Sequence, residues 1–249
     1  MASAAAPWWE SLYDLEMAAA LFPRERARLE LEVDALVRHL ALEPGQRVFD
    51  QCCGVGTLSA PLVARGYEIL GVEQAAAYVE AARVAAGSGR AEFVAEDARV
   101  FRRPGSCDAG FCWGTSYGNA DDAGNQAMLR AAFDTLRPGA RYLVEFANLA
   151  FFLSRWEGCR TRHSPGTGTQ IFRESRLDLE RGRLDQTWTI VPPDAPPRRR
   201  ETSVALYLPH QLAANLRRAG FVDVELFGDL DAQPITRGHG RCLCVGRRP

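Results

Sequence analysis

RVFDQCCGVGTLS, residues 47–59, carries the strongest structural signal in the sequence. Its apolar start leads to Asp50, and Gly54 and Gly56 then allow a tight turn that brings the backbone close to a ligand. Residues 58–66 follow with a helical pattern, so the turn would present backbone N–H groups at the amino end of a helix. The stretch therefore predicts the strand, loop and helix that open a nucleotide-type Rossmann unit.

Three further segments combine an apolar strand with a polar ending. Residues 67–72 predict a second strand that ends at Glu73, roughly 20 residues after the glycines, where a carboxylate can accept hydrogen bonds from ribose hydroxyls. A third strand over 91–94 leads into AEDA at 95–98, and a fourth over 108–113 opens into GTSYGN at 114–119. Ligands of open α/β sheets bind outside the carboxyl ends of the strands, so these endings predict one shared site.

The pattern D-x-x-C-G-x-G at 50–56 resembles motif I of the class I S-adenosylmethionine (SAM)-dependent methyltransferases. The dinucleotide fingerprint requires a third glycine three residues after the second, and this chain has Ser59 there. The resemblance implies that Asp50 lies near the ammonium of SAM, whereas a dinucleotide would bring a pyrophosphate that this carboxylate repels. An NAD oxidoreductase stays as a distant alternative, because Glu73 would also suit an NAD ribose.

The same resemblance implies a set of SAM contacts. The early pair Tyr13-Asp14 is similar to a Tyr-Asp pair near SAM, and the segment at 95–98 resembles the one that flanks the adenine. Gln74 could reach the ribose or form a solvent-facing cap. The expected cofactor-binding residues are Tyr13, Asp50, Cys52, Gly54, Gly56, Glu73, Gln74, Asp97, Ala98 and Trp113.

The expected fold is α/β: a Rossmann-like, seven-stranded, doubly wound sheet in a single methyltransferase domain over 1–249. Residues 7–40 would form an N-terminal helical lid, with an aromatic helical stretch at 7–22 and an amphipathic helix at 24–40. Plain core packing is the alternative role for the aromatic stretch. A fifth strand over 140–146 and a closing helix and two strands over 209–219, 222–227 and 242–246 complete the pattern typical of the family.

An antiparallel β insertion is expected over 165–208, after the fifth strand. Alternating apolar and polar residues predict strands over 170–180, 183–191 and 201–208. The preceding residues 151–168 are expected to form a long loop with a short helix. The arginines at 198–200 follow a proline-rich link, and we expect them in a solvated loop and not in an anion site.

Composition limits the class of protein. The chain has 249 residues, 47% hydrophobic and 24% charged, with a net charge of -1, which fits a globular enzyme and argues against nucleic acid as substrate. Seven cysteines without paired spacing favour reduced thiols over a metal site or disulfides. Without a signal peptide or membrane span, a cytoplasmic location is expected, and the chain could be a monomer or a homodimer.

Four residues are candidates for catalysis: Tyr117, Asn119, Glu145 and His163. The loop at 114–119 is similar to that of aminosugar N-methyltransferases of antibiotic biosynthesis, in which a His or Tyr faces the substrate where this chain has Asn119. Asparagine can orient a substrate but cannot act as a base near neutral pH, so Tyr117 and His163 are the two alternatives for that function. Glu145, at the end of the fifth strand, could contact substrate or tether a loop.

The sequence thus predicts a SAM-dependent methyltransferase that acts on an N or O atom of a small, natural-product-like acceptor. Methylation of an acidic carbon is an alternative, and it would require a base. A SAM- or nucleotide-binding module without catalysis is another. No metal is expected to take part.

Overall fold

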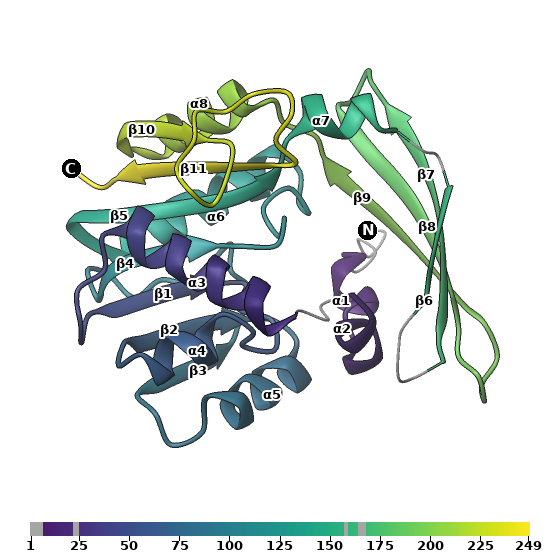
Figure 1. Cartoon of the computed structure of the whole chain (residues 1–249), viewed down its shortest axis with the longest axis horizontal. Helices are drawn as coiled ribbons and strands as arrows, with labels where there is room; N and C mark the ends of the chain where they lie inside the picture. Colours follow the sequence, from purple (N-terminus) through teal and green to yellow (C-terminus); the bar gives the residue numbers. More distant parts are fainter. Residues whose placement is uncertain (1–6, 22–24, 157–158, 164–167) are drawn as a thin grey trace, which may run out of the picture. The chain divides into compact units, whose positions relative to one another are not determined.

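Two β-sheets, each in a compact unit of its own, form the frame of the chain (Figure 1). The computed structural model describes residues 7–21, 25–156, 159–163 and 168–249. We call residues 24–155 with 207–249 the Rossmann unit, and residues 1–23 with 156–206 the insertion unit. Over the described ranges no helix is long and apolar enough to cross a membrane.

The Rossmann unit contains the expected seven-stranded sheet, in the order β10-β11-β5-β4-β1-β2-β3. The first five strands along the chain run parallel to one another, and β11 runs antiparallel to its neighbours β5 and β10. The strands are β1 (Arg47–Gln51), β2 (Glu68–Glu73), β3 (Ala91–Ala95), β4 (Cys107–Cys112), β5 (Leu136–Ala147), β10 (Val222–Phe227) and β11 (Arg241–Arg247). The mixed sheet confirms the fold class that the sequence predicted.

Helices pack on both faces of this sheet. Adjacent residues of β1 contribute to different cores, because side chains alternate along a strand: Val48 packs with α3, α4 and α5, and Phe49 packs with α6 and α8. The helices are α3 (Arg26–Leu40), α4 (Ser59–Ala64), α5 (Ala76–Ala86), α6 (Asp122–Thr135), α7 (Leu149–Ser154) and α8 (Pro209–Ala219). Asp121 caps α6 by accepting the N–H of Gly124 at 2.7 Å.

The insertion unit is an antiparallel sheet in the order β6-β7-β8-β9. Its strands are β6 (Cys159–His163), β7 (Gln170–Asp178), β8 (Arg183–Val191) and β9 (Arg198–Ala205). The three expected strands are present. The expectation of a loop over 151–168 was wrong in part, since β6 pairs there with β7.

The helices α1 (Trp9–Leu12) and α2 (Leu15–Leu21) belong to the insertion unit. The aromatic stretch at 7–22 is therefore not one helix. Tyr13 is extended, and Asp14 starts α2 by accepting the N–H of Met17 at 2.9 Å. Leu12 and Met17 pack against the sheet in a small core with Ile171, Trp188 and Ile190. The lid function expected for residues 7–40 stays a prediction.

The expected loop at 198–200 is instead the start of β9. Arg198 forms ion pairs with Asp14, at 3.2 Å, and with Glu16, while the Nε of Arg200 donates to the carbonyl of Ser11 at 3.1 Å. Acids of the N-terminal segment, far away in the sequence, thus pair with Arg198, which the sequence pattern had assigned to solvent.

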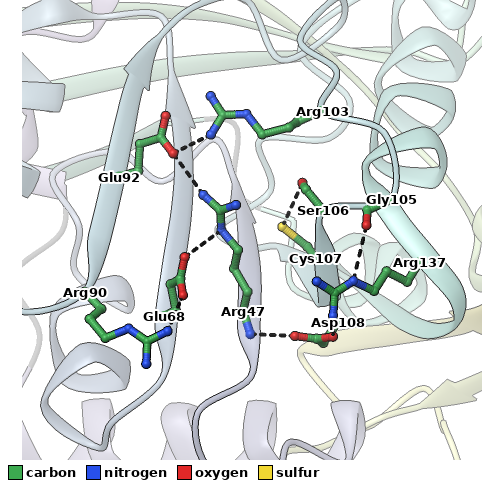
Figure 2. Close-up of polar contacts among 10 residues, drawn as sticks. All are labelled: Arg47, Glu68, Arg90, Glu92, Arg103, Gly105, Ser106, Cys107, Asp108 and Arg137. Carbon is green, nitrogen blue, oxygen red and sulfur yellow. Dashed lines mark hydrogen bonds and ion pairs between the residues drawn. The ribbon is translucent and has the colours of Figure 1, made fainter.

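Ion pairs connect the amino ends of the parallel strands in the Rossmann unit (Figure 2). Arg47, at the start of β1, pairs with Glu68 at 3.0 Å and Glu92 at 2.9 Å, and its backbone N–H donates to Asp108 at 2.8 Å. These partners stand at the starts of β2, β3 and β4. The network closes the edge opposite the predicted ligand site.

We predict that Arg47→Met lowers the free energy of unfolding by about 1 to 2 kcal/mol, because one side chain joins three strands. Arg90→Met is the matched control: its side chain is 70% exposed and pairs with Glu68 alone among the described acids. We expect less than about 0.5 kcal/mol for it. Urea unfolding measures the free energy of unfolding of both variants. Equal losses in the two would show that the connection between three strands adds nothing to stability.

Candidate functional site

The loop after β1 turns at residues with positive φ. Cys52, Gly54 and Gly56 have φ of 66°, 55° and 76°. A Cβ atom at Gly56 would lie 3.0 Å from the Cα and Cβ atoms of Ala82 in α5, so this glycine is required both by its conformation and by the close approach of a helix. The predicted tight turn is therefore present, with its backbone held against α5.

Glu73, the last residue of β2, connects this loop with the next one. Its carboxylate accepts the N–H of Gly54 at 3.3 Å and that of Ala75 at 3.0 Å. Burial raises the pKa of the carboxyl, and the hydrogen bonds from Ala75 and Gly54 oppose that rise only in part. Each carboxylate oxygen has two lone pairs, so these contacts leave acceptor capacity for the hydroxyls of a ligand.

Asp50 is 3% exposed and accepts a hydrogen bond of 2.6 Å from the hydroxyl of Ser59. Burial raises the pKa of Asp50 to about 7; the Ser59 hydrogen bond works against this rise, and the charge of Glu73 adds to it. Ser59 stands where a dinucleotide fingerprint has its third glycine, and sequence reasoning noted it only as a missing glycine. Near neutral pH a ligand cation beside Asp50 would favour its ionised form.

Gln51 is fully buried beneath the site and was not among the expected residues. Its Nε2 donates to the carbonyls of Ala98 and Met128, both at 3.0 Å, and its Oε1 accepts the hydroxyl of Tyr142 at 2.5 Å. A buried amide with all these partners fixes the loop after β3 to β1 and β5. The sequence gives little signal for this role, because Gln51 follows Asp50 at the polar end of the strand.

Asp97 lies in the loop after β3 and pairs with Arg99. The guanidinium donates to both carboxylate oxygens, with Nε at 3.0 and 2.9 Å. Burial raises the pKa of Asp97, but hydrogen bonds from the Arg99 side chain and backbone outweigh it, so the pKa is lowered overall. Beside Asp97, Ala98 is buried.

The remaining cofactor candidates of this edge, Gln74 and Cys52, are half-buried. The neighbouring thiol of Cys112 raises the pKa of the Cys52 thiol, and burial is the second cause of this rise. Cys52 therefore stays a neutral thiol near neutral pH.

Glu145 tethers the loop after β4. Its Oε2 accepts the N–H of Gly114 at 2.8 Å, and its Oε1 lies 3.4 Å from the guanidinium of Arg241, which also pairs with the buried Glu32 at 3.1 Å. The side chain of Glu145 is 6% exposed. Of the two roles that the sequence left open, these contacts favour the tether.

Trp113 and Tyr117 are buried in the same region. The guanidinium of Arg241 lies 5.6 Å from the centre of the Trp113 ring, whose Nε1 has no hydrogen-bond partner among the described residues. The hydroxyl of Tyr117 accepts the side-chain N–H of Asn215 at 3.1 Å, and burial raises its pKa. The Tyr117 hydroxyl is thus occupied by a hydrogen bond to a residue of α8.

Asn119 is half-buried in the loop that follows. The loop is shaped by Asn125, whose Oδ1 accepts the N–H of Gly118 at 3.1 Å and whose Nδ2 donates to the carbonyl of Ala120 at 3.0 Å. Sequence reasoning missed Asn125, because an asparagine inside a helix gives no sign of a partner in the preceding loop.

The parallel strands bring most of the expected residues to one edge of the Rossmann unit. The residues that follow or end β1 to β5 at that edge are Asp50, Cys52, Gly54, Gly56, Glu73, Gln74, Asp97, Ala98, Trp113, Tyr117, Asn119 and Glu145. Tyr13 belongs to the insertion unit. His163 ends β6, and its side chain lies outside the described residues. Within the described residues, no group of His, Cys, Asp and Glu could hold a metal ion.

Known sequences are similar to the part of the chain that contains most of the residues of this edge. A family described as "Methyltransferase domain" matches residues 48–139. A 23S rRNA (uracil(1939)-C(5))-methyltransferase from Alkalilimnicola ehrlichii is 51% identical over 51 residues, which cover 20% of this chain and 12% of that protein. The chain therefore matches only a small part of that relative's length.

Solved structures match over nearly the whole chain. The CcbJ methyltransferase from Streptomyces caelestis superposes with a TM-score of 0.73 at 18% identity, covering 92% of this chain and 94% of that one. A SAM-dependent methyltransferase from Clostridium acetobutylicum gives 0.73 at 12% identity, with 96% and 97% covered. A SAM-bound amino pentose methyltransferase from Micromonospora echinaspora gives 0.66 at 19% identity, with 95% and 98% covered. These similarities establish the shared fold.

The pKa of Asp50 predicts how stability depends on pH. In the unfolded chain this carboxyl ionises near its ordinary value of 3.8, whereas in the fold its pKa is about 7, so folding takes up a proton between these values. The protonated Asp50 carboxyl therefore contributes its full amount to the free energy of unfolding below about pH 4, and this contribution is lost as pH rises to about 7. The Asp50→Asn variant does not titrate at this position, so it does not lose this contribution. We expect its free energy of unfolding, relative to that of wild type, to rise by up to about 4 kcal/mol from pH 4 to pH 8.

Urea unfolding at several pH values between 4 and 8 measures this change. Asp97→Asn is the control, because the pKa of Asp97 is lowered in the fold and the carboxylate is ionised in both states across most of that range. A difference between Asp50→Asn and wild type that stays flat over the whole range would contradict the raised pKa.

Proposed function

We propose that this chain is a class I SAM-dependent methyltransferase and that it methylates a heteroatom, N or O, of a small natural-product-like acceptor. The single observation that carries the cofactor site is the pair of carboxylates around the glycine turn. Glu73 is anchored to Gly54 at 3.3 Å, and Asp50 is buried beneath the same loop. These groups are the complements of a ribose diol and an ammonium.

The residues at this edge fit SAM chemically. We assign Glu73 to the ribose hydroxyls, Asp50 to the ammonium of the amino acid part, and Asp97 with Ala98 to the adenine. Gly56 lets the backbone turn where a Cβ atom would meet Ala82. SAM supplies a methyl group already activated by its sulfonium, so the protein's task is to position the acceptor and, where needed, to accept a proton.

The contacts of the catalytic candidates favour a nitrogen acceptor. The Tyr117 hydroxyl is bonded to Asn215 in the interior, and Glu145 is engaged with Gly114 and Arg241. Asn119, half-buried in the loop after β4, can orient a substrate but cannot remove a proton. An amine needs only to be neutral when it attacks, so positioning by Asn119 would suffice for it.

Methylation of an oxygen or carbon atom stays an alternative, with His163 as the candidate base. A phenol, an alcohol or an acidic carbon benefits from a base, and imidazole has the pKa for that role near neutral pH.

We predict that Glu73→Ala and Asp50→Ala each weaken SAM binding at least about 100-fold, because each removes a charged hydrogen-bond partner from a buried site. Isothermal titration calorimetry gives the dissociation constants. Glu68→Ala, at the opposite end of β2, is the control and should change the affinity less than about twofold. If both site variants bind SAM as wild type does, the assigned cofactor site is wrong.

Turnover tests the acceptor class. We expect S-adenosylhomocysteine (SAH) to form with small amines, with kcat/KM rising with pH until the acceptor amine is neutral. Mass spectrometry of the product locates the methyl group. Products methylated on carbon alone would support the carbon alternative, and SAM binding without SAH formation from any amine, phenol or extract-derived acceptor would favour a binding module.

A further inference from the structure

Tyr207 is the first residue of the Rossmann unit after the insertion, and none of the roles above uses it. Its ring centre lies 5.5 Å from that of Tyr117 in the loop after β4 and 5.7 Å from that of Phe146 in β5. Its hydroxyl lies 3.1 Å from the side-chain nitrogen of Asn125 and 2.9 Å from a carboxylate oxygen of Asp122, both at the amino end of α6. Tyr207 thus contacts both the loop after β4 and the helix that follows it.

The side-chain amide of Asn125 has one orientation that satisfies its neighbours. Its Oδ1 accepts the backbone N–H of Gly118 at 3.1 Å, and its Nδ2 donates to the carbonyl of Ala120 at 3.0 Å. A backbone N–H only donates and a carbonyl only accepts, so exchanging the oxygen and nitrogen of the amide would break both bonds. Asn125 is 1% exposed, and the broken bonds would leave buried polar groups without partners. The second N–H of Nδ2 is therefore the one that faces Tyr207.

This bond also fixes the direction of the Tyr207 hydroxyl. Because the hydroxyl oxygen accepts from Asn125, its single hydrogen is donated to the Asp122 carboxylate, which only accepts when it is ionised. Hydrogen bonds to a charged acceptor are roughly twice as strong as those between neutral groups. A directed chain thus runs from Asp122 through Tyr207 to Asn125. Asn125 in turn holds the backbone on both sides of Asn119.

The loop after β4 is held at its two ends by different side chains. Glu145 holds the start through the N–H of Gly114 at 2.8 Å, and Asn125 holds the end. Between these points Thr115 has a φ of 63°, which is unfavourable for a β-branched residue. Gly118 has a φ of 109°. The loop is therefore not in the conformation that its own residues prefer, and its geometry depends on the two anchors.

We propose that Tyr207 is a positioning residue for methyl transfer. By directing the amide of Asn125, it keeps the end of the loop in one geometry and gives Asn119 one placement from which to orient the acceptor. The link to methyl transfer rests on the proposed function, whereas the hold on the loop does not. The groups of this chain differ from the carboxylates assigned to SAM, so SAM affinity should not depend on the Tyr207 hydroxyl.

Amide hydrogen exchange on the full chain, followed by NMR, tests the hold on the loop. Tyr207→Phe keeps the ring and removes the hydroxyl, so we expect the Gly118 N–H to exchange at least about tenfold faster than in wild type. The amides of β1, in the middle of the sheet, should keep their rates. Tyr67→Phe is the matched control, because it makes the same change in a buried ring just before β2, and it should leave Gly118 unchanged.

Formation of SAH with benzylamine as the acceptor probe tests the link to catalysis. We expect Tyr207→Phe to lower kcat/KM for benzylamine at least about fivefold, while calorimetry gives a SAM affinity within about twofold of wild type. The loss should disappear in an Asn119→Ala background, because Tyr207 acts through Asn119. Asp122→Asn should keep more activity than Asp122→Ala, because an amide oxygen can still accept the Tyr207 hydroxyl.

The two measurements separate the hold on the loop from the proposed function. Unchanged exchange at Gly118 in Tyr207→Phe, or equally faster exchange at Gly118 and in β1, would overturn the hold on the loop. An equal fold loss of kcat/KM with and without Asn119 would overturn the positioning role. A wild-type chain that forms no SAH with benzylamine or other small amines, with the expected change in Gly118 exchange, would contradict the proposed function and uphold the hold on the loop.

Discussion

The carboxylate of Glu73 holds the two loops of the proposed cofactor site in one geometry. It accepts the N–H groups of Gly54 and Ala75, so the ends of β1 and β2 share a single charged side chain. The parallel register of the two strands brings those ends together, and the positive φ of Gly54 and Gly56 lets the first loop turn back towards the second. The other assigned groups, Asp50 and the segment at Asp97, depend on this arrangement for their places around a ligand.

The two edges of the Rossmann sheet use charge in different ways. At the amino edge, Arg47 pairs with Glu68 and Glu92, and charges are matched by opposite charges (Figure 2). At the carboxyl edge, the carboxylates of Asp50 and Glu73 are held by a hydroxyl and by backbone N–H groups, and their pKa values are raised. Carboxylates that lack a fixed cation are suited to receive one from a ligand, which is why we propose the carboxyl edge as the cofactor site.

Sequence reasoning predicted the sheet well, and it predicted that the candidate residues lie at one edge of it, because both depend on local patterns. Apolar runs ended by Asp50 or Glu73, and glycines at fixed spacing, can be recognised within a few residues. It failed where partners are far apart along the chain: Arg198 was assigned to solvent although its acids lie near residue 15, and β6 was hidden because its pairing with β7 gives no periodic signal. The choice between tether and substrate contact for Glu145 required Gly114 and Arg241, and the partner of Asp50 required the fold to bring Ser59 back to β1.

A crystal structure with SAH bound tests the central claim most directly. The account predicts the ribose hydroxyls within hydrogen-bond distance of the Glu73 carboxylate and the ammonium near Asp50, with the backbone of the Gly54–Gly56 turn against the ligand. SAH bound elsewhere, or this turn filled by side chains of the protein, would contradict the account.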